Sequence, residues 1–108
     1  MPYDFALDYL YPLQTSVKKM FGNYAIYCQG KIYLATRLNE KNVNDNGIWI
    51  GTSFEHQKSL KEQFPSLCSL NTYNIKKWLL LPVTAEDFEE TAIQICELIK
   101  SGDERIGV

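Results

Sequence analysis

The sequence predicts an α+β domain, an antiparallel sheet with helices packed on one side. Three observations lead to this class. Short apolar runs rich in aromatic and β-branched residues follow one another across turns, which is typical of sequential antiparallel strands. Stretches with apolar residues at helical spacing stand before, between and after these runs. Turn residues separate the segments, so the predicted order is α-β-β-β-α-(β)-β-α within one domain, residues 1–108.

The first expected element is a helix over Asp4–Tyr11, where apolar residues recur at roughly helical spacing. Pro12 ends it, because proline cannot continue a helix and restricts the residue before it. One alternative is that the helix restarts over Thr15–Lys19.

A β-hairpin is expected over Tyr24–Thr36, where aromatic and β-branched residues dominate. Gln29-Gly30 fits a two-residue primed turn, since glycine adopts the positive φ that such turns require. This turn predicts two facing pairs: Tyr27 with Ile32, and Ala25 with Leu34.

Asparagine and aspartate crowd the next segment, Leu38–Gly47. Their side chains bond to nearby backbone and tolerate left-handed conformations, so we expect a long surface loop. Ile48–Ile50 follows as the third predicted strand.

The second expected helix begins at Thr52 or Ser53, and Thr52 with Glu55 has the spacing of a capping box. Pro65 stops this helix. Three of its apolar residues are expected to share the buried side: Phe54, Leu60 and Phe64.

The last part of the chain predicts a strand and a helix. Ser66–Leu70 is expected to be a short strand or a turn, and Ile75–Val83 contains a strong strand. Thr84 is the expected cap of a helix over Ala85–Ser101, with Gly102 as its stop. The predicted core stripe of this helix is Phe88, Ala92, Ile95 and Ile99.

Composition narrows the function. The chain has 108 residues, 45% of them hydrophobic, and a net charge of -2, which is ordinary for a globular protein and counts against a free-standing nucleic-acid binder. No apolar run approaches the roughly 20 residues that span a bilayer, and no secretory signal is visible, so we expect a cytoplasmic protein without a membrane partner.

The segment Lys18–Tyr27, KKMFGNYAIY, followed by Gly30-Lys31, resembles the opening of the TfoX/Sxy N-terminal domain family. Gly47–Leu60 and Asp87–Gly107 are similar to a single-domain branch of that family without a described role. The resemblance implies a compact α+β domain similar to the YjbR-like fold. It also implies a regulatory role, because some members affect transcription linked to DNA uptake through partner proteins. It implies no activity and no cofactor.

The residue pattern predicts neither a catalytic set nor a metal site. His56 is the single histidine, and it cannot form the usual zinc set alone. Cys28, Cys68 and Cys96 are far apart, without ligand or disulfide spacing. We therefore expect no metal, no cofactor and no enzyme activity.

Three hypotheses remain, and the first is a non-catalytic interaction domain. It would recognise a protein partner through its sheet face or hairpin, and an uncovered aromatic face would favour a homodimer. The candidate interaction residues are Lys18, Lys19, Tyr24, Lys31, Tyr33, His56, Lys76, Lys77 and Arg105.

The second hypothesis is nucleic-acid binding through a basic patch. The pairs Lys18-Lys19 and Lys76-Lys77, with Lys31 and Arg37, would converge beside tyrosines, which suits phosphate contacts and base stacking. Those tyrosines are Tyr24, Tyr33 and Tyr73.

The third hypothesis is a small-ligand or enzyme site in which one deep pocket holds His56 and Cys28. Arg105, between Gly102 and Gly107, is expected either to order this turn by pairing with an acidic neighbour or to serve binding.

Overall fold

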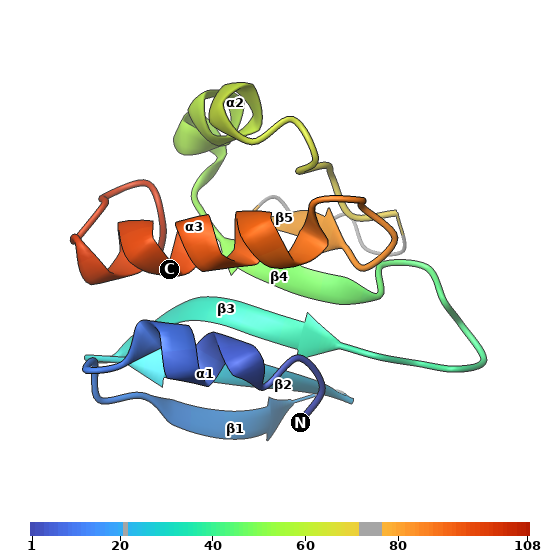
Figure 1. Ribbon diagram of the computed structural model, residues 1–108, viewed down its shortest axis with the longest axis horizontal. Helices are drawn as coiled ribbons and strands as arrows, with labels where there is room; N and C mark the ends of the chain where they lie inside the picture. Colours follow the sequence, from blue (N-terminus) through green and yellow to red (C-terminus); the bar gives the residue numbers. More distant parts are fainter. Residues whose placement is uncertain (21, 72–76) are drawn as a thin grey trace.

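A five-stranded antiparallel sheet forms the centre of the molecule, and helices lie across one of its faces (Figure 1). The computed structural model describes residues 1–20, 22–71 and 77–108. The strands lie in the sheet in chain order. The predicted α+β class and order of elements are confirmed. The strands are β1 Ser16–Met20, β2 Asn23–Cys28, β3 Lys31–Arg37, β4 Gly47–Gly51 and β5 Trp78–Pro82, and the helices are α1 Phe5–Leu10, α2 Phe54–Gln63 and α3 Phe88–Lys100.

The main core lies between the sheet and the helices. Successive side chains of a strand face opposite sides, so alternate residues of β2 to β5 supply this core. The strand residues are Ile26, Leu34, Ile48, Ile50, Leu79 and Leu81, and the helix residues include Ala6, Leu10, Leu60, Phe64, Ala92, Ile95, Cys96 and Ile99. The stripe predicted for α3 is confirmed, with Phe88 packed against the same core at the start of the helix.

The hairpin of β2 and β3 turns at the two residues predicted. Gln29 and Gly30 have φ angles of 52° and 79°, and a type I′ turn, one of the two primed types, needs positive φ at both positions. The predicted pairing of Tyr27 with Ile32 is confirmed.

A β-bulge next to Tyr33 changes the pairing farther along the hairpin. The prediction that Ala25 faces Leu34 is wrong, because Ala25 pairs with Ala35 and Leu34 pairs with Ile26. An extra residue in one strand shifts the pairing beyond it and re-aims the local side chains. As a result, Tyr33 packs against the main core on the helical side.

β1 occupies the segment where a restarted helix was the alternative expectation, and that alternative is wrong. Ser16 pairs with Tyr27 and Met20 pairs with Asn23, in an antiparallel ladder. The first four residues of β1 are exposed. The segment therefore has little hydrophobic periodicity, and pairing with β2 determines its conformation.

The start of α2 differs from the prediction. The N-cap is Ser53, which makes no side-chain capping bond, while Thr52 is completely buried. Phe54 is 73% exposed and does not share the buried side with Leu60 and Phe64. Six residues turn a helix by about 600°, which places Phe54 about 120° around the axis from Leu60.

α3 begins at Phe88, whereas a helix from Ala85 with Thr84 as its cap was expected. Asp87 holds the N-cap position, so both details of the prediction are wrong. The predicted stop is confirmed: Gly102 has a φ of 80°, the left-handed conformation common just after a helix.

The sheet face away from the helices carries a smaller hydrophobic cluster, centred on Trp49. Its ring lies edge-on to that of Trp78, with 6.1 Å between the ring centroids. The indole Nε1–H donates a hydrogen bond to the carbonyl of Asp45 at 2.9 Å. The buried members of the cluster are Ala35, Trp49 and Leu80.

The asparagine-rich segment is a loop, as predicted, and its own side chains hold it. The Asn39 side-chain oxygen accepts hydrogen bonds from two backbone N–H groups farther along the loop. Asn46 exchanges side-chain-to-backbone bonds with Asn39. Arg37 is 6% exposed and donates to the carbonyl of Asn44.

Two backbone bridges extend the sheet. Cys68 and Leu80 exchange hydrogen bonds of 2.9 and 2.7 Å along the outer side of β5, so the segment expected as a short strand or turn forms a single bridge. Val108 and Ile32 exchange bonds of 2.9 and 3.0 Å beside the start of β3.

Candidate functional site

The sequence-predicted site residues lie in separate parts of the molecule. Lys18 and Lys19 are on β1, and Tyr24 is beside them on β2. A second group, Lys31, Tyr33 and His56, lines one hollow near the C-terminal turn. Lys77 lies next to β5, and Lys76 is outside the described residues.

β1 is the edge strand of the sheet, because the strand order begins with it. An edge strand leaves a row of backbone N–H and C=O groups without a strand partner on its outer side. The exposed residues along this edge are Ser16, Val17, Lys18 and Lys19. We call the outer side of Ser16–Met20 the β1 edge.

The two lysines of the β1 edge point to opposite faces of the sheet. The Lys18 ammonium lies 5.0 Å from the ring centroid of Tyr27, and the Lys19 ammonium lies 6.0 Å from that of Tyr24. Tyr24 alternates with the core residue Ile26, so Lys19 is on the helical side and Lys18 on the other. Ammonium groups over tyrosine rings are attracted by the negative ring faces.

Sequence reasoning did not single out Tyr27 as a site residue. Its partner Lys18 lies in the segment Thr15–Lys19, where a restarted helix was the alternative expectation and no strand was expected, so no cross-strand contact was predicted there. Once Ser16–Met20 is recognised as a strand, the alternation of side chains brings Lys18 and Tyr27 to one face.

A hollow of about 460 Å³ adjoins the β1 edge on the helical side. Lys19 supplies one cationic wall and Tyr24 an aromatic one. The residues that line it are Met1, Pro2, Lys19, Gly22, Tyr24 and Leu38. We call it the Lys19 hollow. A cation among mainly apolar walls suits an anionic group carried on an apolar stem.

The described basic residues do not form the convergent patch that the sequence suggested. Lys18 and Lys77 belong to opposite ends of the strand order, which separates them by four strand spacings, roughly 19 Å. Arg37 is buried beneath the asparagine-rich loop, not presented on the surface. Lys76 and Tyr73 lie outside the described residues.

A second hollow, of about 400 Å³, brings together Lys31, Tyr33 and His56. The C-terminal turn closes it with Gly102, Asp103, Glu104 and Ile106. Cys28 does not line this hollow, and it is buried at the hairpin instead of exposed. The prediction of one pocket holding His56 and Cys28 is therefore wrong.

Arg105 fastens the C-terminal turn to α2. Its guanidinium makes an ion pair with Asp103 at 2.8 Å, as expected for an acidic neighbour. It also donates hydrogen bonds to Ser59 Oγ at 2.9 Å and to Gln63 Oε1 at 2.7 Å. The bonds from Arg105 hold the pKa of the Asp103 carboxyl below its usual value. These contacts engage Arg105 in fixing the turn.

Cys68 and Cys96 have the properties of unreactive thiols. Burial raises the pKa of Cys96 to about 12, and burial also raises the pKa of Cys68. The thiolate is the nucleophilic form, so raised pKa values disfavour thiol chemistry. Over residues 1–20, 22–71 and 77–108, no three His, Cys, Asp or Glu side chains are grouped to hold a metal ion.

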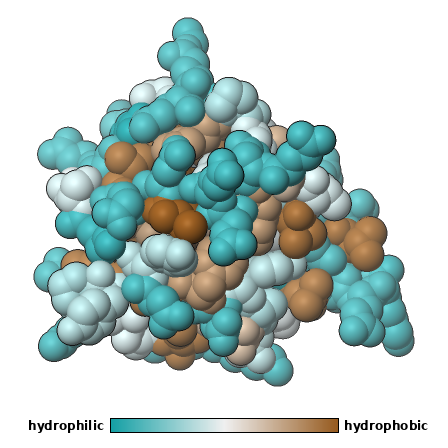
Figure 2. All heavy atoms as spheres, in the orientation of Figure 1, coloured by the Kyte–Doolittle hydropathy of each residue, from teal (hydrophilic) through white to brown (hydrophobic). Residues whose placement is uncertain are grey.

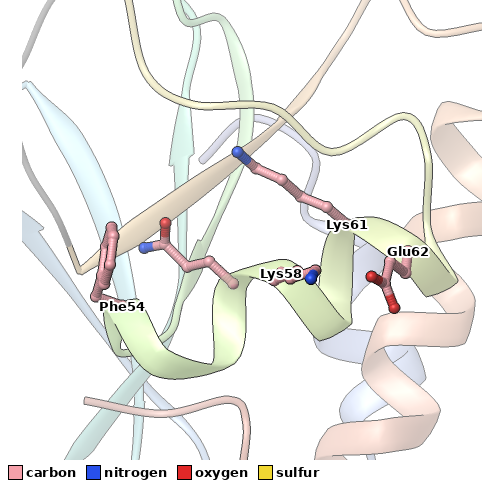
Figure 3. A pocket seen from close by; sticks show the side chains of 5 residues that line it. Phe54, Lys58, Lys61 and Glu62 are labelled. Carbon is pink, nitrogen blue, oxygen red and sulfur yellow. The ribbon is translucent and has the colours of Figure 1, made fainter.

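The outer side of α2 carries a third hollow, of about 540 Å³. Figure 3 shows Phe54, Lys58, Lys61 and Glu62 projecting along this one helix. The described residues that line it all belong to this one helix, and they define no particular ligand. On the helical face as a whole, hydrophobic atoms occur in small groups between hydrophilic side chains (Figure 2).

None of the helices in the described part of the chain has the length and apolar character needed to cross a bilayer. Comparison of the chain with family models, with curated proteins and with solved structures finds no match.

Proposed function

We propose that this protein is a non-catalytic interaction domain that binds an extended, acidic segment of a partner protein along the β1 edge. The segment would add a strand to the sheet beside β1. The resemblance to the TfoX/Sxy N-terminal domain family supports a cytoplasmic regulatory module of this kind, acting through a partner.

The observation that carries the proposal is an exposed edge strand with two lysines. An extended peptide can pair with the unpartnered backbone groups of such a strand, and its side chains then give specificity. Lys18 and Lys19 place one positive charge on each face of β1. A neighbouring strand with acidic residues would therefore meet a cation on either side.

The same lysines argue against a second copy of this chain as the occupant. Pairing β1 with β1 of another molecule would place four lysines along one two-stranded ribbon. The β1 sequence, Ser-Val-Lys-Lys-Met, contains no carboxylate to offset them. Like charges on adjacent strands destabilise pairing, and edge lysines commonly protect against self-association.

Nucleic-acid binding is less well supported by the arrangement of charges. A backbone-binding surface needs several cations along one face. The described lysines of β1 point to opposite faces, and Lys77 lies at the far side of the sheet.

A capped ten-residue peptide of alternating threonine and glutamate tests the proposal. We expect it to shift the backbone amide signals of β1 in NMR titrations at low salt. Its threonine–glutamine counterpart should bind at least about tenfold more weakly, because the charge complementarity is gone. Two N-methylated versions of the glutamate peptide distinguish strand addition from simple charge attraction. One is methylated at the odd-numbered residues and the other at the even-numbered residues. No binding of the glutamate peptide, or equal binding of both N-methylated forms, would contradict the proposal.

The hollow at His56 supports a second candidate, a small-ligand site. It joins Lys31, Tyr33 and His56 from the hairpin and α2, and the Arg105 contacts hold its wall in place. A fragment screen by NMR, with His56→Ala as the matched control, tests it. Shifts confined to this hollow and abolished by the variant would favour it over the β1 edge.

A further inference from the structure

The β1 edge adjoins the Lys19 hollow on the helical side of the sheet. Lys19, on that side, lines the Lys19 hollow together with Tyr24. Lys18, on the opposite side, lies over Tyr27 and lines none of the three hollows. The two faces of β1 thus carry the same charge and the same lysine–tyrosine contact, and the helical face also adjoins the Lys19 hollow.

A strand added to β1 would direct its side chains alternately to these two faces. Those on the helical side would stand beside Val17 and Lys19, because cross-strand neighbours are about 5 Å apart. A side chain there would reach the mouth of the Lys19 hollow. One on the other side would meet Lys18 and the ring of Tyr27.

We propose that the Lys19 hollow receives a glutamate side chain of the bound segment and thereby sets its orientation and register. The methylene stem would contact the apolar walls, and the carboxylate would pair with the Lys19 ammonium. This inference rests on the proposed function, since the glutamate belongs to the strand bound at the β1 edge.

The charge composition of the hollow supports an acidic occupant. Among the described residues that line it, Lys19 has the single charged side chain, and Met1, Pro2 and Leu38 form apolar walls. A carboxylate would find the Lys19 ammonium and no acidic side chain among the described lining residues. A neutral or basic side chain would lose that pairing.

Lys18→Met and Lys19→Met form a matched pair of variants for the test. Each removes one positive charge from an exposed position of the same strand, so both weaken long-range attraction equally. With the threonine–glutamate peptide as probe, we expect Lys19→Met to reduce affinity about tenfold or more. Lys18→Met should reduce it by about threefold or less. Equal losses, or a larger loss for Lys18→Met, would overturn the inference and leave strand addition intact.

The rings of Tyr24 and Tyr27 report on the two faces in the same titration. With tyrosine rings labelled with carbon-13, we expect the peptide to shift the Tyr24 signals more than those of Tyr27, and Lys19→Met to abolish the difference. Dominant shifts at Tyr27 would overturn the inference. Absence of any binding by the glutamate peptide would overturn the proposed function, and this inference with it.

Discussion

The two edges of the sheet differ in how far the chain itself covers them. Beyond β5, the segment around Cys68 bridges to Leu80, and Leu67 enters the main core. Beyond β1, no strand follows in the described sheet, and the edge residues are exposed. The β5 edge is bridged at Leu80 by a segment of its own chain, whereas the β1 edge carries two lysines.

This difference teaches where stability and binding reside in the molecule. Leu79 and Leu80 are almost wholly buried, so β5 contributes to both hydrophobic clusters. β1 buries little and therefore can accept changes, or a partner, without loss of the core. Edge strands covered by their own chain cannot bind an extended segment, while β1 has its outer groups available.

The largest expected effect on the free energy of unfolding is at β5. Leu79→Ala should lower the free energy of unfolding by about 2–5 kcal/mol, because it removes buried methyl groups and leaves a cavity. Val17→Ala, on the β1 edge, should change it by about 0.5 kcal/mol or less. Urea unfolding followed by circular dichroism measures both. If Val17→Ala lowered the free energy of unfolding nearly as much as Leu79→Ala, the β1 edge would not be the exposed edge.

A smaller loss of unfolding free energy is expected when the C-terminal turn is changed. Arg105→Met removes the ion pair with Asp103 and the bonds to Ser59 and Gln63, and should cost about 1–3 kcal/mol of unfolding free energy. Arg105→Lys should recover only part of this, since lysine lacks the planar fork. The same urea titrations compare these variants. Full recovery by lysine would mean that charge alone fastens the turn.

Low pH should lower the free energy of unfolding by protonating Asp87, beside the β5 edge. Hydrogen bonds from Ser66 and Thr91 lower the pKa of its carboxyl in the folded protein, and Ser66 belongs to the segment that bridges to β5. Because the folded pKa is depressed, this contribution is present above the ordinary pKa of about 4 and is lost as pH falls through the folded value.

Urea midpoints measured from pH 6 down to pH 2.5 follow this loss. Asp87→Asn lacks the titrating carboxyl, so its stability should fall less steeply than that of the unmodified protein. Parallel curves for the two proteins would exclude Asp87 as a source of the acid sensitivity.

The smallest effect on stability is expected for Lys18→Ala combined with Lys19→Ala. Both side chains are exposed, so the unfolding free energy should change by about 0.5 kcal/mol or less. Self-association should rise, because the edge loses its charges. Sedimentation velocity at increasing concentration measures this. A variant that stays as monomeric as the parent would show that the lysines do not protect the edge.

The sequence predicted those parts of the fold that local chemistry determines. The Gln29-Gly30 turn has the positive φ angles that its residues favour. The asparagine-rich loop is held by side-chain bonds to nearby backbone, as at Asn39. The core stripe of α3 followed from spacing alone, since Ala92 and Ile95 repeat on one helix face.

The parts that it missed depend on long-range pairing. β1 has a partner on one side only and is exposed, so its sequence carried no clear strand periodicity. The bulge near Tyr33 changed the hairpin register, which turn chemistry does not specify. For the candidate site, the lysine pairs were visible in the sequence, but their positions on the sheet depend on strand order.

The contact between α1 and α3 joins the two ends of the chain. The Cys96 thiol donates a weak hydrogen bond to the carbonyl of Ala6, ninety residues away, whereas β2 and β3 meet across a two-residue turn. Contacts distant in sequence are slower to form because a longer loop must close. We expect pulsed hydrogen exchange during refolding to protect β2 and β3 before α1, and earlier protection of α1 would contradict this. During synthesis on the ribosome, α1 would then lack its contact with α3 until α3 has emerged.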